Sequence, residues 1–121
     1  MFVIMKKVFY LKTCGTCTKI LKMFNLSDWE LREIKSSPLT EEELEDMYKL
    51  TNSYEALFSR RSTQIKAQNI DVKSLGEKDF KKLLLEHYSF LKRPVFVTHQ
   101  EIFIGNEKQN IENLEHFFNR K

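Results

Sequence analysis

Residues 8–25 decide the fold of this chain, and they read VFYLKTCGTCTKILKMFN. The first four are apolar, β-branched or aromatic, a short run that is typical of a buried strand. From residue 18 onward the period changes, because Ile20, Leu21 and Phe24 recur at helical spacing. The pattern predicts an extended segment over residues 2–12, including Phe2 to Ile4, then a turn and a helix over about residues 15–25.

The turn places a Cys-x-x-Cys pair at the start of the predicted helix. Backbone N–H groups are unpaired there, and the helix dipole stabilises a thiolate. Lys12, Lys19 and Lys22 are close in sequence, so the pKa of Cys14 is expected below the roughly 8.5 of a free thiol. Cys17 follows one turn later, on the same side and more buried. We therefore expect Cys14 to be the nucleophile and Cys17 the resolving thiol that closes a disulfide.

Two other uses of such a pair remain open. Zinc prefers four ligands, but the chain has no further cysteine, and His87, His99 and His116 show no paired ligand spacing. Two buried and unreactive thiols can also fall at this spacing. The strand before the motif and the helix after it favour redox chemistry over both alternatives.

Composition limits the class of protein. The 121 residues are 41% hydrophobic and 12% aromatic, enough for one domain with a real core. The net charge of +3 comes from 20 basic and 17 acidic residues mixed along the chain, so no direct nucleic-acid binding is expected. Neither a signal peptide nor a membrane span is evident. Two cysteines in one Cys-x-x-Cys indicate reactive thiols in a reducing compartment, and we expect a cytoplasmic location.

The remaining pattern places the other elements in order. Residues 29–34 alternate apolar and polar side chains, which predicts a half-buried strand parallel to the first, with Trp29 and Ile34 in the core. Thr40 and Glu43 form a capping box at the start of a helix with an apolar face. We expect further helices at residues 54–58, 63–70, 77–88 and 108–119. A loop is expected at residues 71–76, and strands 95–98 and 102–104 are expected to form a hairpin.

This order of elements predicts the fold class. A βαβ unit, a run of small helices and a ββα unit give an α/β, thioredoxin-like fold with a four-stranded mixed sheet flanked by helices. We expect a single domain over residues 1–121, with a helical insertion at about residues 36–90.

Three stretches resemble the arsenate reductase/Spx family of thioredoxin-like proteins, which is related to the glutaredoxins. They are Cys14-Gly-Thr-Cys17, Ser37-Pro-Leu-Thr-Glu-Glu-Glu-Leu44, and Phe90-Leu-Lys-Arg-Pro94-Val-Phe-Val followed by Ile-Gly105-Asn. The resemblance extends over nearly the full length. It implies that Cys14 is the reacting thiol, that Cys17 matches the second cysteine of a redox switch, and that Pro94 follows a cis peptide bond and lies against the active cysteine.

The resemblance also implies a site for an anion. Family arsenate reductases use an arginine in the Arg-Pro step to hold an oxyanion and steady the thiolate, and Arg93 matches it. A second arginine follows a short insertion helix, where Arg60 or Arg61 falls. Thr13 and Pro94 complete the expected substrate or oxyanion site. A third family arginine is missing here, because residues 102–107 read IFIGNE.

Three functions follow as expectations. The first is a small thiol–disulfide oxidoreductase without a bound cofactor, whose partners are a disulfide substrate and glutathione or another thiol reductant. The second is a redox-sensing regulator of the Spx type that binds the RNA polymerase α subunit. The third is a glutaredoxin-coupled arsenate reductase, which the missing arginine disfavours. A membrane partner is not expected.

Overall fold

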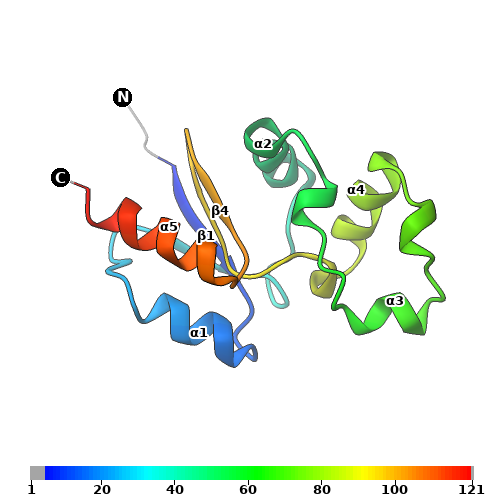
Figure 1. The fold of residues 1–121 in the computed structure, drawn as a ribbon, viewed down its shortest axis with the longest axis horizontal. Helices are drawn as coiled ribbons and strands as arrows, with labels where there is room; N and C mark the ends of the chain where they lie inside the picture. The colour runs from blue at the N-terminus through cyan, green and yellow to red at the C-terminus, as the bar shows by residue number, and fades with distance from the viewer. Residues whose placement is uncertain (1–4, 121) are drawn as a thin grey trace. The chain divides into compact units, whose positions relative to one another are not determined.

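The computed structural model describes residues 5–120 of the chain. Its strands form one four-stranded sheet in the order β2-β1-β3-β4 (Figure 1). β1 lies parallel to β2 and antiparallel to β3, and β3 is antiparallel to β4, so the mixed sheet is confirmed. The strands are β1 (Lys6–Tyr10), β2 (Glu30–Glu33), β3 (Val95–Thr98) and β4 (Ile102–Ile104). The predicted extension through Phe2 to Ile4 lies outside the described residues.

The chain forms two compact units. The first combines the chain up to Ser37 with the chain from Arg93 onward, and it holds the sheet with helices α1 (Gly15–Leu21) and α5 (Lys108–Phe118). The second unit, Pro38–Lys92, consists of helices, 3₁₀ turns and connecting segments, and the boundaries of an insertion at residues 36–90 stay a prediction. A single folding domain over residues 1–121 stays a prediction.

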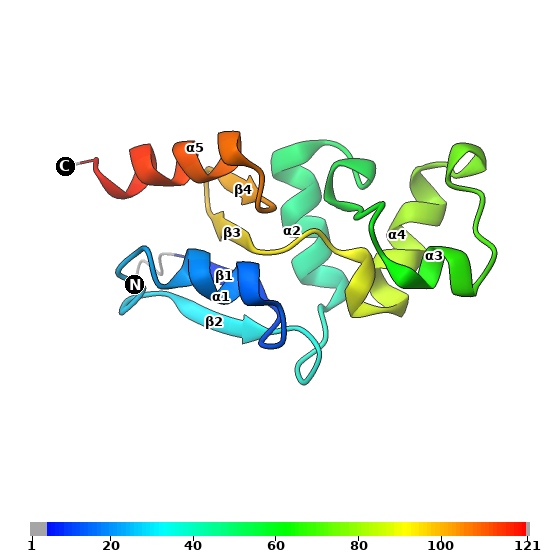
Figure 2. The ribbon, with the colours of Figure 1, turned by 60° about the horizontal axis from the view of Figure 1, so that its bottom comes forward.

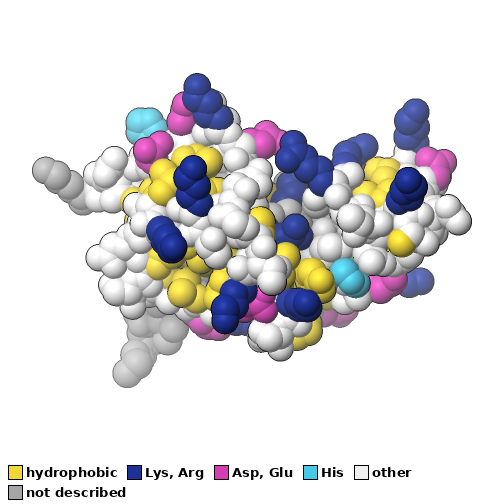
Figure 3. All heavy atoms as spheres, turned by 90° about the horizontal axis from the view of Figure 1, so that it is seen from below, with side chains coloured by type: hydrophobic (Ala, Val, Ile, Leu, Met, Phe, Trp, Pro, Cys, Tyr) yellow, Lys and Arg dark blue, Asp and Glu magenta, His cyan; other side chains and the backbone are white. Residues whose placement is uncertain are grey.

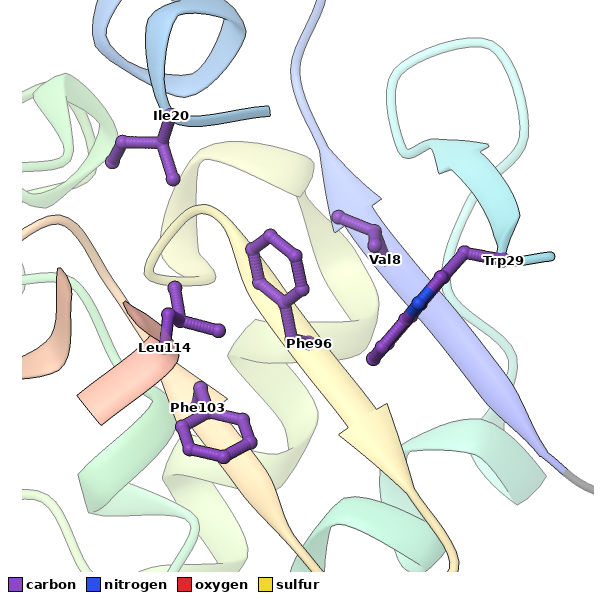
Figure 4. Close-up of a cluster of buried hydrophobic side chains, with 6 residues drawn as sticks. All are labelled: Val8, Ile20, Trp29, Phe96, Phe103 and Leu114. Carbon is purple, nitrogen blue, oxygen red and sulfur yellow. The ribbon is translucent and has the colours of Figure 1, made fainter. Parts of the chain in front are cut away.

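One face of the sheet carries a cluster of buried hydrophobic side chains in the first unit (Figure 4). Val8, Phe96 and Phe103 are register neighbours on three adjacent strands, so their side chains share this face. Three more residues complete the cluster. They are Ile20 of α1, Leu114 of α5, and Trp29, which directly precedes β2. Because both helices contribute to one cluster, α1 and α5 cover the same face of the sheet (Figure 2).

The first helix is shorter than the sequence pattern predicts. The N–H groups of Met23 and Phe24 donate to the carbonyls of Ile20 at 3.0 Å and Leu21 at 3.5 Å, three residues back. This tighter spacing closes the helix in a turn, and the prediction of a helix to residue 25 is wrong. Phe24 nevertheless reaches the core, where its ring stacks on Phe118 with centroids 4.5 Å apart.

The strand β2 lies at an edge of the sheet. Trp29 and Ile34, at its two ends, are buried as predicted. Leu31 is 48% exposed, although it shares a face with its register partner Val8. An edge strand lies at the margin of the helical layer, so alternation alone overstated how much of β2 is buried.

The second unit begins with α2 (Glu41–Thr51), which has the predicted capping box. The Oγ1 atom of Thr40 accepts the Glu43 N–H at 3.1 Å, and Oε1 of Glu43 accepts the Thr40 N–H at 3.0 Å. Further along, the ring of Phe58 lies 5.4 Å from that of Phe90 and 4.9 Å from that of Phe80. The remaining helices are α3 (Thr63–Ala67), α4 (Glu77–Glu86), and 3₁₀ turns at Glu55–Leu57, Val72–Ser74 and Tyr88–Phe90.

Helix ends in the second unit differ from the predicted ones. α3 ends at Ala67, because Asn69 adopts a left-handed conformation with φ 53°. α4 ends at Glu86, because His87 is extended and its Nδ1 accepts the Ser89 N–H at 3.1 Å. His87 therefore caps the following 3₁₀ turn and does not lie on the face of α4. The predicted loop at residues 71–76 contains one further 3₁₀ turn.

Candidate functional site

Cys14 is the N-cap of α1 and lies at the end of the loop that connects β1 to the helix. Its N–H donates to the Leu11 carbonyl at 3.1 Å, and its own carbonyl accepts the Thr18 N–H at 3.1 Å. The side chain is half-buried, whereas Cys17, one turn on, is fully buried. A Cβ built on Gly15 meets no atom of the described chain within 4 Å, so the start of the helix faces open space. Both thiols are free.

The surroundings of Cys14 favour its thiolate. Partial burial, the largest single influence, raises the pKa of Cys14. The Cys17 N–H, the Cys17 thiol, the positive charge of Arg93 and the Thr16 N–H act in the opposite direction. Together they lower the pKa of Cys14 below its ordinary value, as the sequence predicts.

The surroundings of Cys17 favour its thiol. Burial is the largest influence, and with the adjacent charge of Cys14 it raises the pKa of Cys17 to about 12. Of the two thiols, Cys14 therefore loses its proton at the lower pH, and Cys17 keeps its proton at neutral pH. Of the two sulfurs, only Cys14 combines partial exposure with a lowered pKa.

The cation that acts on Cys14 comes from the far end of the sequence. Arg93 precedes β3, its peptide bond to Pro94 is cis, and Pro94 is buried. The Pro94 carbonyl accepts the Gly105 N–H at 2.8 Å, which ties the start of β3 to the end of β4. The lysines at 12, 19 and 22 are not among the groups that shift the pKa of Cys14. The predicted direction was right, but the named lysines were the wrong cause.

The role of Arg93 leads to a first prediction. We expect Arg93→Met to raise the pKa of Cys14 and slow its alkylation at pH 7, because the thiolate loses a nearby positive charge. Arg93→Lys, which keeps the charge, should restore most of the reactivity. The pH profile of iodoacetamide labelling measures both variants. Identical profiles for the wild type and Arg93→Met would contradict this role.

Glu33 fastens the segment that leads to Cys14, a contact that no sequence spacing indicated. One carboxylate oxygen accepts the Lys12 N–H at 2.9 Å, and the other accepts the Ser36 N–H at 2.9 Å and the Ser36 hydroxyl at 2.8 Å. These donors, first the Lys12 and then the Ser36 N–H, lower the pKa of Glu33. The carboxylate thus joins the end of β2 to the loop just before the thiol.

The Glu33 contacts lead to a second prediction. We expect Glu33→Ala to lower the free energy of unfolding at pH 7 by about 1–2 kcal/mol, because charge-assisted hydrogen bonds are lost. Since folding lowers the pKa of Glu33, its stabilisation is present above the unfolded pKa, near 4.3, and disappears as the pH falls through the folded value. Urea unfolding at pH 7 and pH 3 measures this. Glu30→Ala, on the same strand, is the matched control, and an equal loss at both pH values would contradict the assignment.

The remaining residues that the sequence singled out are divided between the two units. Thr13 is exposed in the loop beside Cys14. Arg60 and Arg61 belong to the second unit, where both are exposed and Arg60 pairs with Glu55 at 2.6 Å. His87 bonds to Ser89, as described above. The structure therefore groups Cys14, Cys17 and Arg93 within the first unit, and Thr13 and Pro94 adjoin them in sequence.

Within residues 5–120 no group of three or more His, Cys, Asp or Glu side chains is arranged to hold a metal ion. No helix in the described part of the chain combines the length and apolar character needed to cross a bilayer.

Known proteins resemble this chain over most of its length. It is 28% identical to the global transcriptional regulator Spx 2 of Bacillus anthracis over 82% of this chain and 78% of the relative. An ArsC family related protein from Bacteroides fragilis superposes with a TM-score of 0.73 at 22% identity, covering 90% of this chain and 96% of the other. An arsenate reductase from Vibrio cholerae gives 0.71 at 15% identity, covering 94% and 98%.

The structural likenesses show the fold, which is thioredoxin-like as predicted. Membership rests on a different finding, because the ArsC family model matches residues 9–114. That match includes both cysteines, Arg93 and Pro94. The chain therefore belongs to the ArsC family, the arsenate reductase/Spx family of thioredoxin-like proteins.

Proposed function

We propose that this protein is a cytoplasmic thiol–disulfide redox protein that works through the Cys14–Cys17 pair. One observation carries the proposal: the partly exposed thiol of the pair has a lowered pKa and the buried thiol has a raised one. A dithiol mechanism requires this difference, because the nucleophile must ionise and reach the substrate, whereas the resolving thiol reacts only after the mixed disulfide has formed. Arg93 would steady the thiolate and orient an anionic partner.

The reaction would proceed in two exchanges. The Cys14 thiolate attacks one sulfur of a substrate disulfide, which breaks the substrate S–S bond, forms a mixed disulfide and releases one substrate thiolate. Cys17 then loses its proton to that thiolate or to solvent and attacks the Cys14 sulfur, releasing the second substrate thiolate. The substrate gains two electrons and the pair is oxidised to a disulfide. Glutathione or another thiol reductant would return the pair to its reduced state.

The reduction potential of the pair tests the proposal. The protein is equilibrated in glutathione buffers, free thiols are trapped, and the oxidised fraction is measured, with Cys17→Ala as the control that cannot close the disulfide. We expect a reversible two-electron couple between roughly −180 and −300 mV, the range of catalytic and sensing dithiols. Failure to form an intramolecular disulfide at any buffer potential would rule out a two-cysteine mechanism.

A second candidate is favoured by the similarity to Spx 2, whose name describes a global transcriptional regulator. In that case closure of the Cys14–Cys17 disulfide would change the affinity for the RNA polymerase α subunit. Binding of that subunit to the reduced and oxidised protein, measured beside disulfide reductase turnover, separates the two functions. Redox-dependent binding without turnover favours the regulator, and turnover without binding favours the oxidoreductase.

Arsenate reduction is the least favoured of the three functions. The residues from Ile102 to Glu107 include no arginine, so an arsenate oxyanion would lack one cation of the family pattern. If this protein reduces arsenate, Cys14→Ser should abolish turnover, whereas Cys17→Ser should be tolerated.

A further inference from the structure

The segment that carries Cys14 has charge of one sign only. Residues 5–27 contain Lys6, Lys7, Lys12, Lys19 and Lys22 and no aspartate or glutamate. The first carboxylate after them, Asp28, is bonded to Lys6 at 2.8 Å. The segment that carries the thiol therefore contributes positive charge only, and the Glu33 carboxylate, which accepts the Lys12 N–H at 2.9 Å, comes from β2.

Three of these lysines are available to a partner. Lys12, Lys19 and Lys22 are exposed, and none of them makes an ion pair with any residue in the described range. They are also not among the groups that shift the pKa of Cys14, where Arg93 is the cation. Their charge is thus used neither for a salt bridge nor for activating the thiol.

Two of these lysines lie on the outer side of α1, and an exposed apolar residue follows them in sequence. Lys19 and Lys22 are three residues apart, on the side of α1 opposite to the buried Cys17 and Ile20. Met23 follows at 48% exposure, one of only two large hydrophobic side chains of residues 5–120 described as exposed. Figure 3 views the molecule from the side of α1, where Lys and Arg side chains stand around hydrophobic ones. We call Lys12, Lys19, Lys22 and Met23 the lysine face.

We propose that the lysine face docks an acidic protein segment, the segment that carries the disulfide which Cys14 attacks. The inference rests on the proposed thiol–disulfide function and adds the chemistry of the partner. Unpaired lysines favour carboxylates near the partner's cysteines. From Cys14 to Lys22 the face extends about 12 Å along the helix axis, and it ends at an apolar contact, Met23. A length of polypeptide fits such a face.

Peptides that differ only in charge test the proposal. Three synthetic peptides carry the same internal disulfide, flanked by Asp and Glu, by Asn and Gln, or by Lys. The rate of oxidation of the reduced protein is measured with each. At roughly 10 mM ionic strength the Debye length is about 30 Å, so charges on the peptide and the protein attract or repel over a long distance. Under these conditions we expect the acidic peptide to react about tenfold faster than the basic one. The difference should shrink to less than about twofold near 1 M salt.

Two variants with the same change in net charge test whether the preference for the acidic peptide depends on the lysine face. Lys12→Gln/Lys19→Gln/Lys22→Gln should remove the preference, so that the acidic, neutral and basic peptides react at rates within about twofold of one another. The control Lys66→Gln/Lys73→Gln/Lys78→Gln changes net charge equally at exposed lysines of the second unit and should keep the preference. A preference lost equally in both variants would assign the effect to net charge and overturn the lysine face.

The remaining outcomes separate the two proposals. Equal rates with all three peptides at low salt would overturn the acidic partner and leave the redox function standing. No exchange with any peptide would overturn the redox function itself. A single-stranded oligonucleotide is also compared with the acidic peptide at the same concentration of negative charge. If the oligonucleotide binds more tightly and displaces the peptide, the lysine face binds nucleic acid and the proposal of a protein partner is overturned.

Discussion

Cys14→Ser should lower the rate of disulfide reduction by roughly a thousandfold or more, because a serine hydroxyl is not ionised at neutral pH and forms no disulfide. The expectation follows from the unequal environments of the two sulfurs. Cys14 is half-exposed with a lowered pKa, whereas Cys17 is fully buried with a pKa raised to about 12. Loss of the first sulfur leaves no accessible nucleophile.

Cys17→Ser should act at a later step. Cys14 can still attack, but no second sulfur is available to release it, so the protein should accumulate as a mixed disulfide with one substrate molecule. Mass spectrometry of the quenched reaction measures the adduct, and stopped-flow traces measure the first exchange. Thr16→Ser, which keeps both thiols and the backbone N–H beside Cys14, is the control. A trapped adduct on Cys17 in the Cys14→Ser variant would reverse the assigned roles.

Phe96→Ala should lower the free energy of unfolding by about 3–5 kcal/mol, the range for removing a large aromatic side chain from a packed core. Phe96 is fully buried on β3, between the strands that pair with it on both sides. Its ring meets Trp29 edge-on with centroids 5.6 Å apart, and Phe24 and Phe118 at 6.2 Å and 6.1 Å. Truncation removes these contacts and leaves a cavity under both helices.

Urea unfolding followed by circular dichroism measures this loss. Phe96→Leu, which retains most of the volume, keeps the comparison possible if the alanine variant does not fold, and it should lose less than Phe96→Ala. Met23→Ala is the surface control, with an expected change within about 0.5 kcal/mol. A loss below about 1 kcal/mol for Phe96→Ala would show that the cluster in Figure 4 contributes little to stability.

The sequence by itself determined the order of the elements and the position of the cysteine pair at the start of a helix. The spacing of apolar residues located every strand of the sheet in the described part of the chain. For the hairpin strands Val95–Thr98 and Ile102–Ile104, the predicted first and last residues are the observed ones. The Thr40–Glu43 capping box was also readable, because its two hydrogen bonds join residues three apart. The Cys-x-x-Cys before a helical pattern indicated the reactive pair. These features are local, so neighbouring residues encode them.

The tertiary structure alone decided the features that depend on residues distant in sequence. α1 and α4 end before their apolar patterns do, because hydrogen bonds in the following turns close each helix. The cation that stabilises the Cys14 thiolate is Arg93 and not a nearby lysine, because antiparallel pairing of β3 with β1 brings the start of β3 to the end of β1. Glu33 reaches the Lys12 N–H for a similar reason, since the parallel pairing of β1 and β2 aligns their carboxyl ends. A periodic pattern specifies which side of an element is buried, whereas these contacts depend on where the sheet places its strand ends.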